Sequence, residues 1–377
     1  MTRPSATLAL LVSMAVLTGC GNPPRPAESA PDVDSDPAGA RPREPGSKAI
    51  APGWRSQVLL ETGSRLSGVA IGDVLPDAPG NEIVVVGTDH TLRLIWRDGT
   101  EWRDEIIART PGEMIQVDVG EVDANRPGDE IVAVGVTSGG EDDTGAKGAV
   151  VYVTQDGDEW TATQVFEDTA LLHGVCIRPS GIWVTGYSKK VHLLGPQDAV
   201  PWPAHSAPLP GPGRSIAPTS GGVVVACRDG SVIYIALSGV FGPVPLPRDK
   251  RDAGRARIAT AGRDVLAADD DGTLTLLTTS DDNAHQGVVL HRSTDKLRGA
   301  VLADLDPTAP GLEAATAGYD GTIRVFTRVS SQWSEDVVAR DTDRFHHLTS
   351  GELPGWKGVV LVGVNYSGKV TVAGKAE

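Results

Sequence analysis

Basic side chains recur at one position in six of the seven units of a repeating sequence, although the chain as a whole is acidic, with a formal net charge of −15. Arg carries a planar fork of donors that suits carboxylate, sulfate or phosphate, and His can exchange a proton near neutral pH. A cleft lined by one sign of charge concentrates ligands of the opposite sign. We therefore predict an anion-accepting funnel formed by Arg65, His173, Arg214, Arg257, Arg298, His346 and His347.

The same residues allow a second interpretation. Their side chains could bond loop carbonyls or neighbouring acids around a packed channel, which is how buried polar groups are commonly satisfied. The second unit departs from the pattern, because it has Glu113 and Gln116 where the others have a cation. Both interpretations place these residues at the same position of the repeat, so only their partners can separate the two.

A second recurring set of residues is acidic. A small residue, an acid and an aliphatic residue are followed by Pro-Gly and by an acid that opens an apolar run. This phrase occupies residues 72–83 and returns at 120–131, at 303–313 and, weakly, at 351–355. Self-similarity at a fixed period indicates a repeat architecture.

The elements that must position both sets are short β-strands. Runs rich in Val, Ile, Leu and Thr alternate with Gly, Asp, Asn and Pro turns, and no amphipathic helical stretch occurs. A mean period of about 46 residues is typical of four-stranded propeller blades. Seven units begin near Leu66, Met114, Leu172, Arg214, Arg257, Arg298 and His346. The sequence therefore predicts an all-β, seven-bladed β-propeller over residues 51–377.

The two ends of the propeller predict how the ring closes. Three units finish with a strand that begins with tryptophan, at Trp102, Trp160 and Trp333. The seventh unit stops at residues 370–372 without such a strand, and a matching one begins at Trp54. We predict that this N-terminal outer strand pairs with the last blade, which leaves no open edge. The tryptophans are interpreted as packing residues of outer strands.

Residues 1–19 resemble a bacterial lipoprotein signal peptide with its lipobox. Arg3 precedes an apolar stretch at 8–16, and small residues stand just before Cys20. The apolar stretch is too short for a membrane-spanning helix, which needs about 20 apolar residues. The resemblance implies lipid on Cys20 and an exported, membrane-anchored lipoprotein at the outer membrane, in the periplasm or at the cell surface. Gly21, where an Asp would favour retention, favours sorting to the outer membrane. An ordinary signal peptide with an incidental cysteine is the alternative. Residues 20–50 are rich in Pro, Ala, Ser and charge, and we predict a disordered, lipid-anchored linker.

With the units in place, the propeller resembles FG-GAP/VCBS-type repeats, the group that includes the integrin α-subunit head. Four blades carry some form of the phrase, a Gly-Asp-aliphatic start and an acid before the next strand, while blades three, four and five lack it. In that family this turn can hold Ca²⁺, which takes six to eight oxygen ligands. Blade two keeps the fullest set, Glu121, Asp123, Asn125 and Asp129. The alternative is that these acids cap turns by accepting backbone N–H bonds.

The sequence assigns no catalytic residue. It has no paired-cysteine zinc pattern, phosphate loop, nucleophile elbow or helical His-Glu-x-x-His. Cys176 and Cys227 fall at different depths of their predicted blades, so we interpret them as buried small hydrophobic residues and not as a disulfide. No cofactor other than Ca²⁺ is expected.

Together these features favour a monomeric, non-enzymatic, lipid-anchored propeller for binding or scaffolding. It would contact a protein, an envelope glycan or another anionic ligand through its top face, where the innermost strands begin. The alternative is an exported hydrolase or lyase acting on a sugar or polyanion, with His173, His346 or His347 as general base, and a third is a structural role in envelope assembly. An acidic chain lacks the broad basic footprint that nucleic acid requires. An acidic, Gly-rich stretch at 137–148 on the same face is interpreted either as a further place for recognition or as a tolerated surface excursion.

Overall fold

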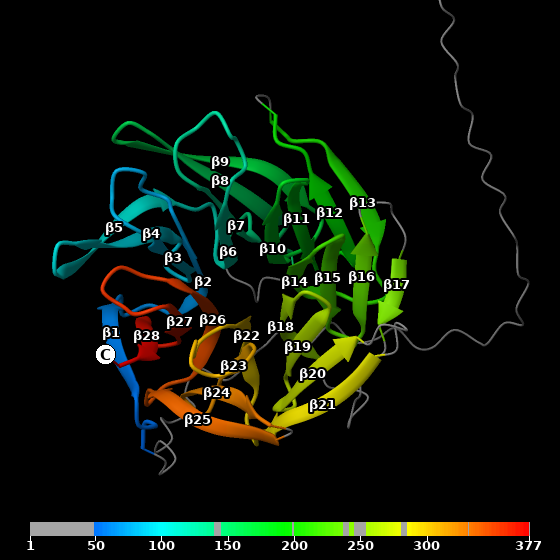
Figure 1. Ribbon diagram of the computed structural model, residues 1–377. Helices are drawn as coiled ribbons and strands as arrows, with labels where there is room; N and C mark the ends of the chain where they lie inside the picture. The colour runs from blue at the N-terminus through cyan, green and yellow to red at the C-terminus, as the bar shows by residue number, and fades with distance from the viewer. Residues whose placement is uncertain are drawn as a thin grey trace, which may run out of the picture. The chain divides into compact units, whose positions relative to one another are not determined.

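The computed structural model describes residues 49–138, 145–197, 200–236, 241–244, 254–279, 285–330 and 332–376. Within these ranges the regular elements are all β-strands, which form seven four-stranded sheets around a common axis (Figure 1). No helix in the described part of the chain is long and apolar enough to cross a membrane. The predicted signal peptide, Cys20 and most of the predicted linker lie outside the described residues, as do residues 139–144 of the acidic stretch.

The first six blades each use four consecutive strands, ordered from the channel outwards. Blade one contains β2 (Leu66–Gly72), β3 (Glu82–Gly87), β4 (Thr91–Asp98) and β5 (Glu101–Arg109), and blade two contains β6 (Met114–Gly120), β7 (Glu130–Val136), β8 (Gly148–Asp156) and β9 (Glu159–Asp168). Blade three contains β10 (Leu172–Arg178), β11 (Gly181–Gly186), β12 (Lys190–Leu194) and β13 (Ala204–Pro208), and blade four contains β14 (Gly213–Thr219), β15 (Gly222–Cys227), β16 (Val232–Ala236) and β17 (Phe241–Val244). Blade five contains β18 (Arg255–Ala261), β19 (Asp264–Asp269), β20 (Thr273–Thr279) and β21 (His285–Arg292), and blade six contains β22 (Leu297–Ala303), β23 (Glu313–Gly318), β24 (Thr322–Val329) and β25 (Gln332–Arg340).

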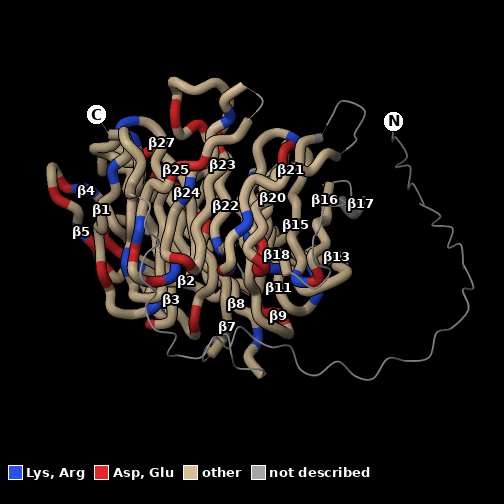
Figure 2. Tube along the Cα trace, turned by 90° about the horizontal axis from the view of Figure 1, so that it is seen from below, with Lys and Arg blue, Asp and Glu red and all other residues tan. Residues whose placement is uncertain are grey.

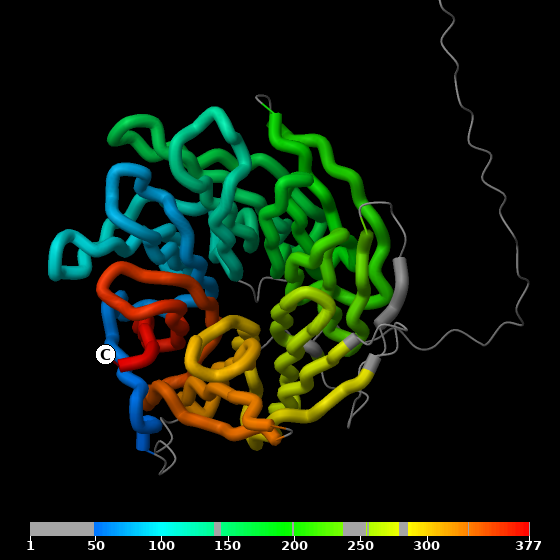
Figure 3. The backbone as a smooth tube through the Cα atoms, viewed as in Figure 1, coloured from blue at the N-terminus to red at the C-terminus, as the bar shows by residue number. Residues whose placement is uncertain are grey.

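Blade seven closes the ring with strands from both ends of the propeller. Its inner strands are β26 (Phe345–Glu352), β27 (Val359–Asn365) and β28 (Lys369–Lys375), and its outermost strand is β1 (Trp54–Glu61). β1 pairs antiparallel with β28, from Trp54 opposite Lys375 to Glu61 opposite Lys369. Figure 1 shows blue β1 beside red β28, and the tube view of Figure 3 shows the same closure. The predicted closure and the predicted seven-bladed fold are therefore confirmed.

The hydrophobic core lies between neighbouring blades. One cluster joins Val84 and Leu94 of blade one to Ala133 and Val151 of blade two, and equivalent clusters follow around the ring. The second strand of a blade is covered on both faces, so all six residues of β3 are buried. Trp54 is also buried, and the other strand-heading tryptophans pack against these clusters. Interpreting the tryptophans as packing residues agrees with this arrangement.

Each innermost strand carries a β-bulge near its start. In blade one the pairing passes from Leu66 opposite Gly87 to Gly68 opposite Val86, which leaves Ser67 as the extra residue. A Cβ atom on Gly87 would lie 2.1 Å from the carbonyl oxygen of Arg65, so glycine permits this close approach. A bulge bends the strand and redirects its side chains. The equivalent bulge residues are Ile115, His173, Arg214, Ala256, Arg298 and His346.

The recurring acidic phrase forms a turn closed by a glutamate between the first two strands of a blade. Glu82 accepts hydrogen bonds from the backbone N–H groups of Val74 and Leu75 at 2.8 and 2.9 Å. Glu130 and Glu313 each accept the two equivalent bonds in blades two and six. Burial raises the pKa of Glu82 to about 7, although both backbone bonds favour the charged form. The phrase therefore has a structural role in three blades.

Candidate functional site

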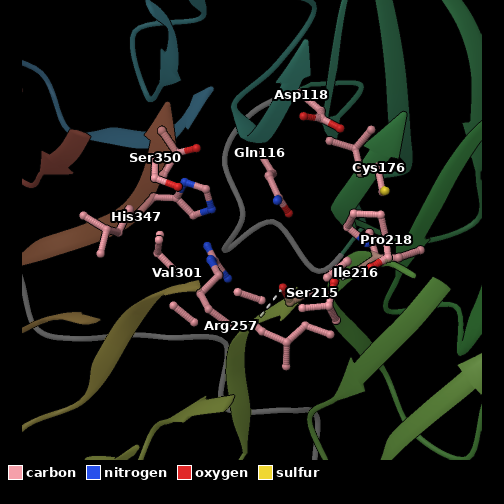
Figure 4. Close-up of a pocket in the computed structure, with 18 of the residues that line it drawn as sticks. Gln116, Asp118, Cys176, Ser215, Ile216, Pro218, Arg257, Val301, His347 and Ser350 are labelled. Carbon is pink, nitrogen blue, oxygen red and sulfur yellow. Dashed lines mark hydrogen bonds between the residues drawn. The ribbon is translucent and has the colours of Figure 1, made fainter. Parts of the chain in front are cut away.

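The central channel contains a cavity of about 410 Å³, lined by the innermost strands of six blades (Figure 4). Burial decreases along these strands, since Arg257 and His347 are buried whereas Thr260 and Ser350, further along β18 and β26, are half-buried. The cavity therefore opens where the innermost strands end, on the face that carries the acidic turns, which is opposite the top face predicted to contact the ligand. Its deep end lies beside the bulges.

Arg257 occupies the deep end with a partly unpaired guanidinium. The residue is only 2% exposed, and Nη1 donates to the carbonyl oxygen of Ala256 at 2.9 Å. Nε and Nη2 have no hydrogen-bond partner among the described residues. These two nitrogens share one edge of the planar group, the edge that can grip a carboxylate through two parallel bonds. Burial and the charges of Arg298 and Arg214 lower the pKa of Arg257 to about 9, so the group stays cationic at neutral pH.

Two buried hydrogen-bond acceptors accompany this cation. His347 is 7% exposed, and its ring bonds the backbone of Val69 while Nδ1 has no partner in the described structure. Burial and the Arg257 charge lower the pKa of His347 to about 3, which keeps the ring neutral and leaves a lone pair on Nδ1. Gln116 is 8% exposed, and its Oε1 has no described partner either. Figure 4 shows the side chain of Arg257 pointing into the channel towards His347 and Gln116.

Asp118 and Ser215 add polar oxygens to the cavity wall. Asp118 accepts a bond from the Ile177 N–H at 2.8 Å, and burial raises the pKa of its carboxyl to about 6. The Ser215 hydroxyl accepts a bond from the Ile258 N–H at 3.2 Å, drawn as a dashed line in Figure 4. The cavity therefore combines one cationic donor edge with several acceptors.

The remaining arginines predicted for the funnel are engaged with acids. Arg214 and Arg298 both pair with Asp270, at 2.7 and 3.2 Å, and Arg65 pairs with Glu113. Arg214 and Arg298 are almost fully buried, at 2% and 0% exposure. These contacts correspond to the second interpretation of the basic residues, in which neighbouring acids satisfy them.

His173 and His346 are satisfied by backbone carbonyls. His173 Nδ1 donates to the Arg214 oxygen at 2.7 Å, and His346 Nδ1 donates to the Ser67 oxygen at 2.8 Å. Both rings are buried, and burial beside the arginines holds each pKa well below its usual range. The innermost strands thus bring all seven predicted residues to one end of the channel, but of those seven only Arg257 and His347 line the cavity.

Gln116 was not predicted as a site residue, although a signal for it exists. Gln116, Arg257 and His347 each follow the bulge residue of their strand. In the sequence Gln116 is the exception to a basic pattern, because the position of the bulge is defined only once the strands are paired. Once paired, the three positions are equivalent.

Aromatic side chains cover the bulge end of the channel. The guanidinium carbon of Arg344 lies 4.2 Å from the ring centroid of Tyr366, and that of Arg298 lies 5.3 Å from the ring of Tyr319. The two tyrosine hydroxyls hydrogen-bond at 2.5 Å. In the side view of Figure 2, Lys and Arg are interspersed with Asp and Glu around the ring. The ligand preference of the channel therefore depends on its individual side chains and not on a uniformly positive electrostatic potential.

Two of the acids proposed for Ca²⁺ are engaged by neighbouring nitrogen groups. Asp123 accepts bonds from the backbone and side-chain nitrogens of Asn125 at 3.1 and 2.8 Å, and its other oxygen lies 3.4 Å from Arg126. Asp129 accepts a bond from the N–H of Asp73 in the neighbouring blade, and Glu121 is exposed. Among the described residues, no group of three or more His, Cys, Asp or Glu could hold a metal ion. This geometry fits turn capping better than a calcium site.

A Ser-His-Asp chain joins blades two and three on their outer strands. His192 Nδ1 accepts from the Ser206 hydroxyl at 2.7 Å, and Nε2 donates to Asp168 at 3.2 Å. Ser188 donates to the same Asp168 oxygen at 2.5 Å. None of these residues lines the central cavity. The chain satisfies the buried polar groups of Asp168 and His192 across a blade seam and ends at the exposed Ser206.

Both described cysteines are free and buried. Burial raises the pKa of the Cys227 thiol to about 11 and raises that of Cys176 as well. Such thiols are protonated and unreactive at neutral pH. They act as small core residues.

The structure is similar to the solved WD40 β-propeller domain of Doa1. The two share 11% sequence identity, and the match covers 85% of this chain and 96% of that domain with a TM-score of 0.60. At this identity the likeness shows the propeller fold alone. No protein-family model and no curated protein matches the sequence.

Proposed function

We propose that this chain is an exported, lipid-anchored binding propeller with degenerate FG-GAP/VCBS-type repeats, which holds an anionic ligand for a role in the cell envelope. The observation that carries the proposal is the unpaired Nε/Nη2 edge of buried Arg257 in the central cavity. A buried cation with two unused donors costs stability unless something binds it. β-propellers commonly serve as binding or scaffolding modules, which agrees with this proposal.

The lipid anchor is supported by the sequence around Cys20, and the composition of the linker supports a domain held away from the membrane. We propose that this domain is a monomer. We expect full-length protein to fractionate with membranes and to carry the mass of acyl chains on Cys20. Cys20→Ala should move it to the soluble fraction or leave the signal uncleaved. Wild-type protein that is soluble and unmodified at Cys20 would contradict the anchor.

The anionic ligand is supported by Arg257 and is tested by retention on immobilised glycans. We expect purified full-length protein to be retained by uronate-containing glycans and to pass through neutral ones of equal length. Arg257→Ala should abolish retention, whereas Arg103→Ala removes an exposed, surface-paired cation and should leave retention unchanged. Equal behaviour on acidic and neutral glycans would overturn the anionic-ligand part of the proposal.

Binding is favoured over turnover by the state of the histidines. His347 is the one candidate general base among the three that lines the cavity. A general base works best with a pKa near the working pH, and the pKa of His347 is lowered to about 3. We therefore propose a protein or envelope glycan as partner and no hydrolysis or elimination of it.

A further inference from the structure

We propose that the central cavity binds a carboxylate whose neighbouring atoms carry hydrogen-bond donors, the chemistry shared by sugar acids and by α-hydroxy and α-amino acids. The inference rests on the anionic-ligand part of the proposed function and names its chemical class. It is carried by three buried side chains from three blades, Arg257, His347 and Gln116, whose unpartnered polar atoms face one cavity.

The donor edge of Arg257 selects a flat anion with two oxygens. Nη1 is fixed by the Ala256 carbonyl, so the plane of the guanidinium is set before a ligand arrives. The remaining Nε and Nη2 present two parallel N–H donors, which match the two oxygens of a carboxylate. Because the side chain is buried, little side-chain entropy remains to be lost on binding.

The two unpaired acceptors in the cavity favour a ligand that carries hydrogen-bond donors next to its carboxylate. His347 Nδ1 carries a lone pair, and Gln116 presents Oε1 without a partner. A hydroxyl next to the carboxylate would donate to one of these two acceptors, and an ammonium or a second hydroxyl would satisfy both. Sulfate or fully ionised phosphate would instead place anionic oxygens against these acceptors and against Asp118, which also lines the cavity. Unpaired acceptors of this kind discriminate strongly between otherwise similar ligands.

The shape of the cavity limits the size of the ligand. About 410 Å³ lies within the usual range for small-molecule sites, about 300–1,000 Å³. The arginines and tyrosines at the bulge end are packed, so entry is from the face where the innermost strands end. A free small acid or the acidic end of a longer chain fits this geometry, whereas a polymer crossing the ring does not.

The test is isothermal titration calorimetry on purified full-length protein with a matched ligand series. The series contains D-glucuronate, L-lactate, L-alanine, acetate, sulfate and methyl glucoside. We expect at least one of the first three to bind about tenfold or more tighter than acetate, because acetate leaves His347 and Gln116 unpaired. Sulfate and methyl glucoside should show no binding. Tightest binding by glucuronate assigns a sugar acid, and tightest binding by alanine assigns an amino acid.

Two site variants and one control locate the binding. Arg257→Lys keeps the charge but loses the two-donor edge, and Gln116→Leu removes one acceptor at similar volume; each should weaken the best ligand about tenfold or more. Arg178→Lys is the control, since Arg178 lies at the open end of β10, outside the cavity lining, and donates to the Thr219 carbonyl. Circular dichroism melts establish whether each variant folds. If Arg257→Lys does not fold, Gln116→Leu still tests the site.

Specific results would overturn the inference. Acetate or sulfate binding as tightly as the donor-bearing carboxylates would show that charge alone is recognised. Equal losses in Arg178→Lys and Arg257→Lys would place the site elsewhere. Retention on acidic glycans without binding of any small carboxylate would refute the inference while leaving the proposed function standing. Failure of both measurements would refute the two together.

Discussion

Replacing Arg257 by methionine should stabilise the unliganded propeller while removing carboxylate binding. Methionine has a similar length and no charge, so it fills the deep end of the cavity without needing hydrogen-bond partners. Arg257 is 2% exposed and close enough to Arg214 and Arg298 for their charges to lower its pKa. A residue that costs stability at a binding site is expected where function requires it.

The magnitude follows from the pKa of Arg257. Its value falls from above about 12 in an unfolded chain to about 9 in the folded protein. Each tenfold loss in proton affinity is worth about 1.4 kcal/mol, so charge on Arg257 costs the folded state on the order of 4 kcal/mol at neutral pH. The lost hydrogen bond to Ala256 and the imperfect packing of methionine together destabilise the variant by about 2 kcal/mol. The expected net gain is about 2 kcal/mol, or about 3 °C in Tm for a propeller of this size.

The pH dependence provides an internal check on that reasoning. Below pH 9 both the folded and the unfolded chain hold the proton on Arg257, so the cost is fully present. Above pH 9 the folded protein releases this proton while the unfolded chain retains it, so the cost declines. The advantage of Arg257→Met over wild type should therefore be constant from pH 7 to 8.5 and should shrink towards pH 10.5.

The assay is scanning calorimetry of both full-length proteins without carboxylate buffers, with Arg178→Met as the control variant. Arg178 is half-buried and bonds the Thr219 carbonyl, so its replacement should lower Tm slightly. A fall in Tm of more than about 2 °C for Arg257→Met would refute the reasoning, because Arg257 would then be a stabilising structural residue. Unchanged carboxylate binding by that variant would refute the site.

Three further outcomes follow from the hydrogen bonds and pKa values. Glu130→Ala should lower the urea-derived free energy of unfolding by about 2–3 kcal/mol, because two turn N–H groups lose their acceptor, and Glu130→Gln should lower it by less; equal losses would contradict the capping role. His347→Gln should flatten the loss of stability between pH 6.5 and 5 by about 2 kcal/mol, since the unfolded chain protonates His347 in that window and the folded protein, with a pKa of about 3, does not; parallel pH profiles would argue against it. Millimolar Ca²⁺ should leave Tm unchanged, because Asp123 is already engaged by Asn125, and a rise of several degrees would reveal a calcium site.

Much of the architecture could be predicted because the same strand and turn pattern recurs in the sequence of successive blades. Seven copies of one strand pattern define seven blades, and the unmatched outer strand at Trp54 shows where the ring closes. The Glu82, Glu130 and Glu313 caps also follow from the repeat, because the same spacing gives the same two backbone bonds. Such features depend on local sequence, where each copy is evidence for the others.

The candidate site was predicted only in outline. The recurrence of basic residues correctly placed Arg65, Arg214, Arg257 and Arg298 at the start of innermost strands, but it could not rank them. Asp270, which lies just after β19, pairs with Arg214 of one neighbouring blade and Arg298 of the other. A local sequence pattern does not show which carboxylate of another blade will pair with an arginine. Paired and unpaired arginines therefore cannot be distinguished in the sequence.

The sequence by itself determined the number of blades, the way the ring closes and the level in the channel at which the basic residues gather. These properties depend on period, alternation and turn residues, which are local. Only the tertiary structure decided that Arg257, His347 and Gln116 share a cavity while the other cations are satisfied. The reason is physical: a bulge in every innermost strand shifts the facing register by one residue, and partners across blade seams then determine which charges remain unpaired.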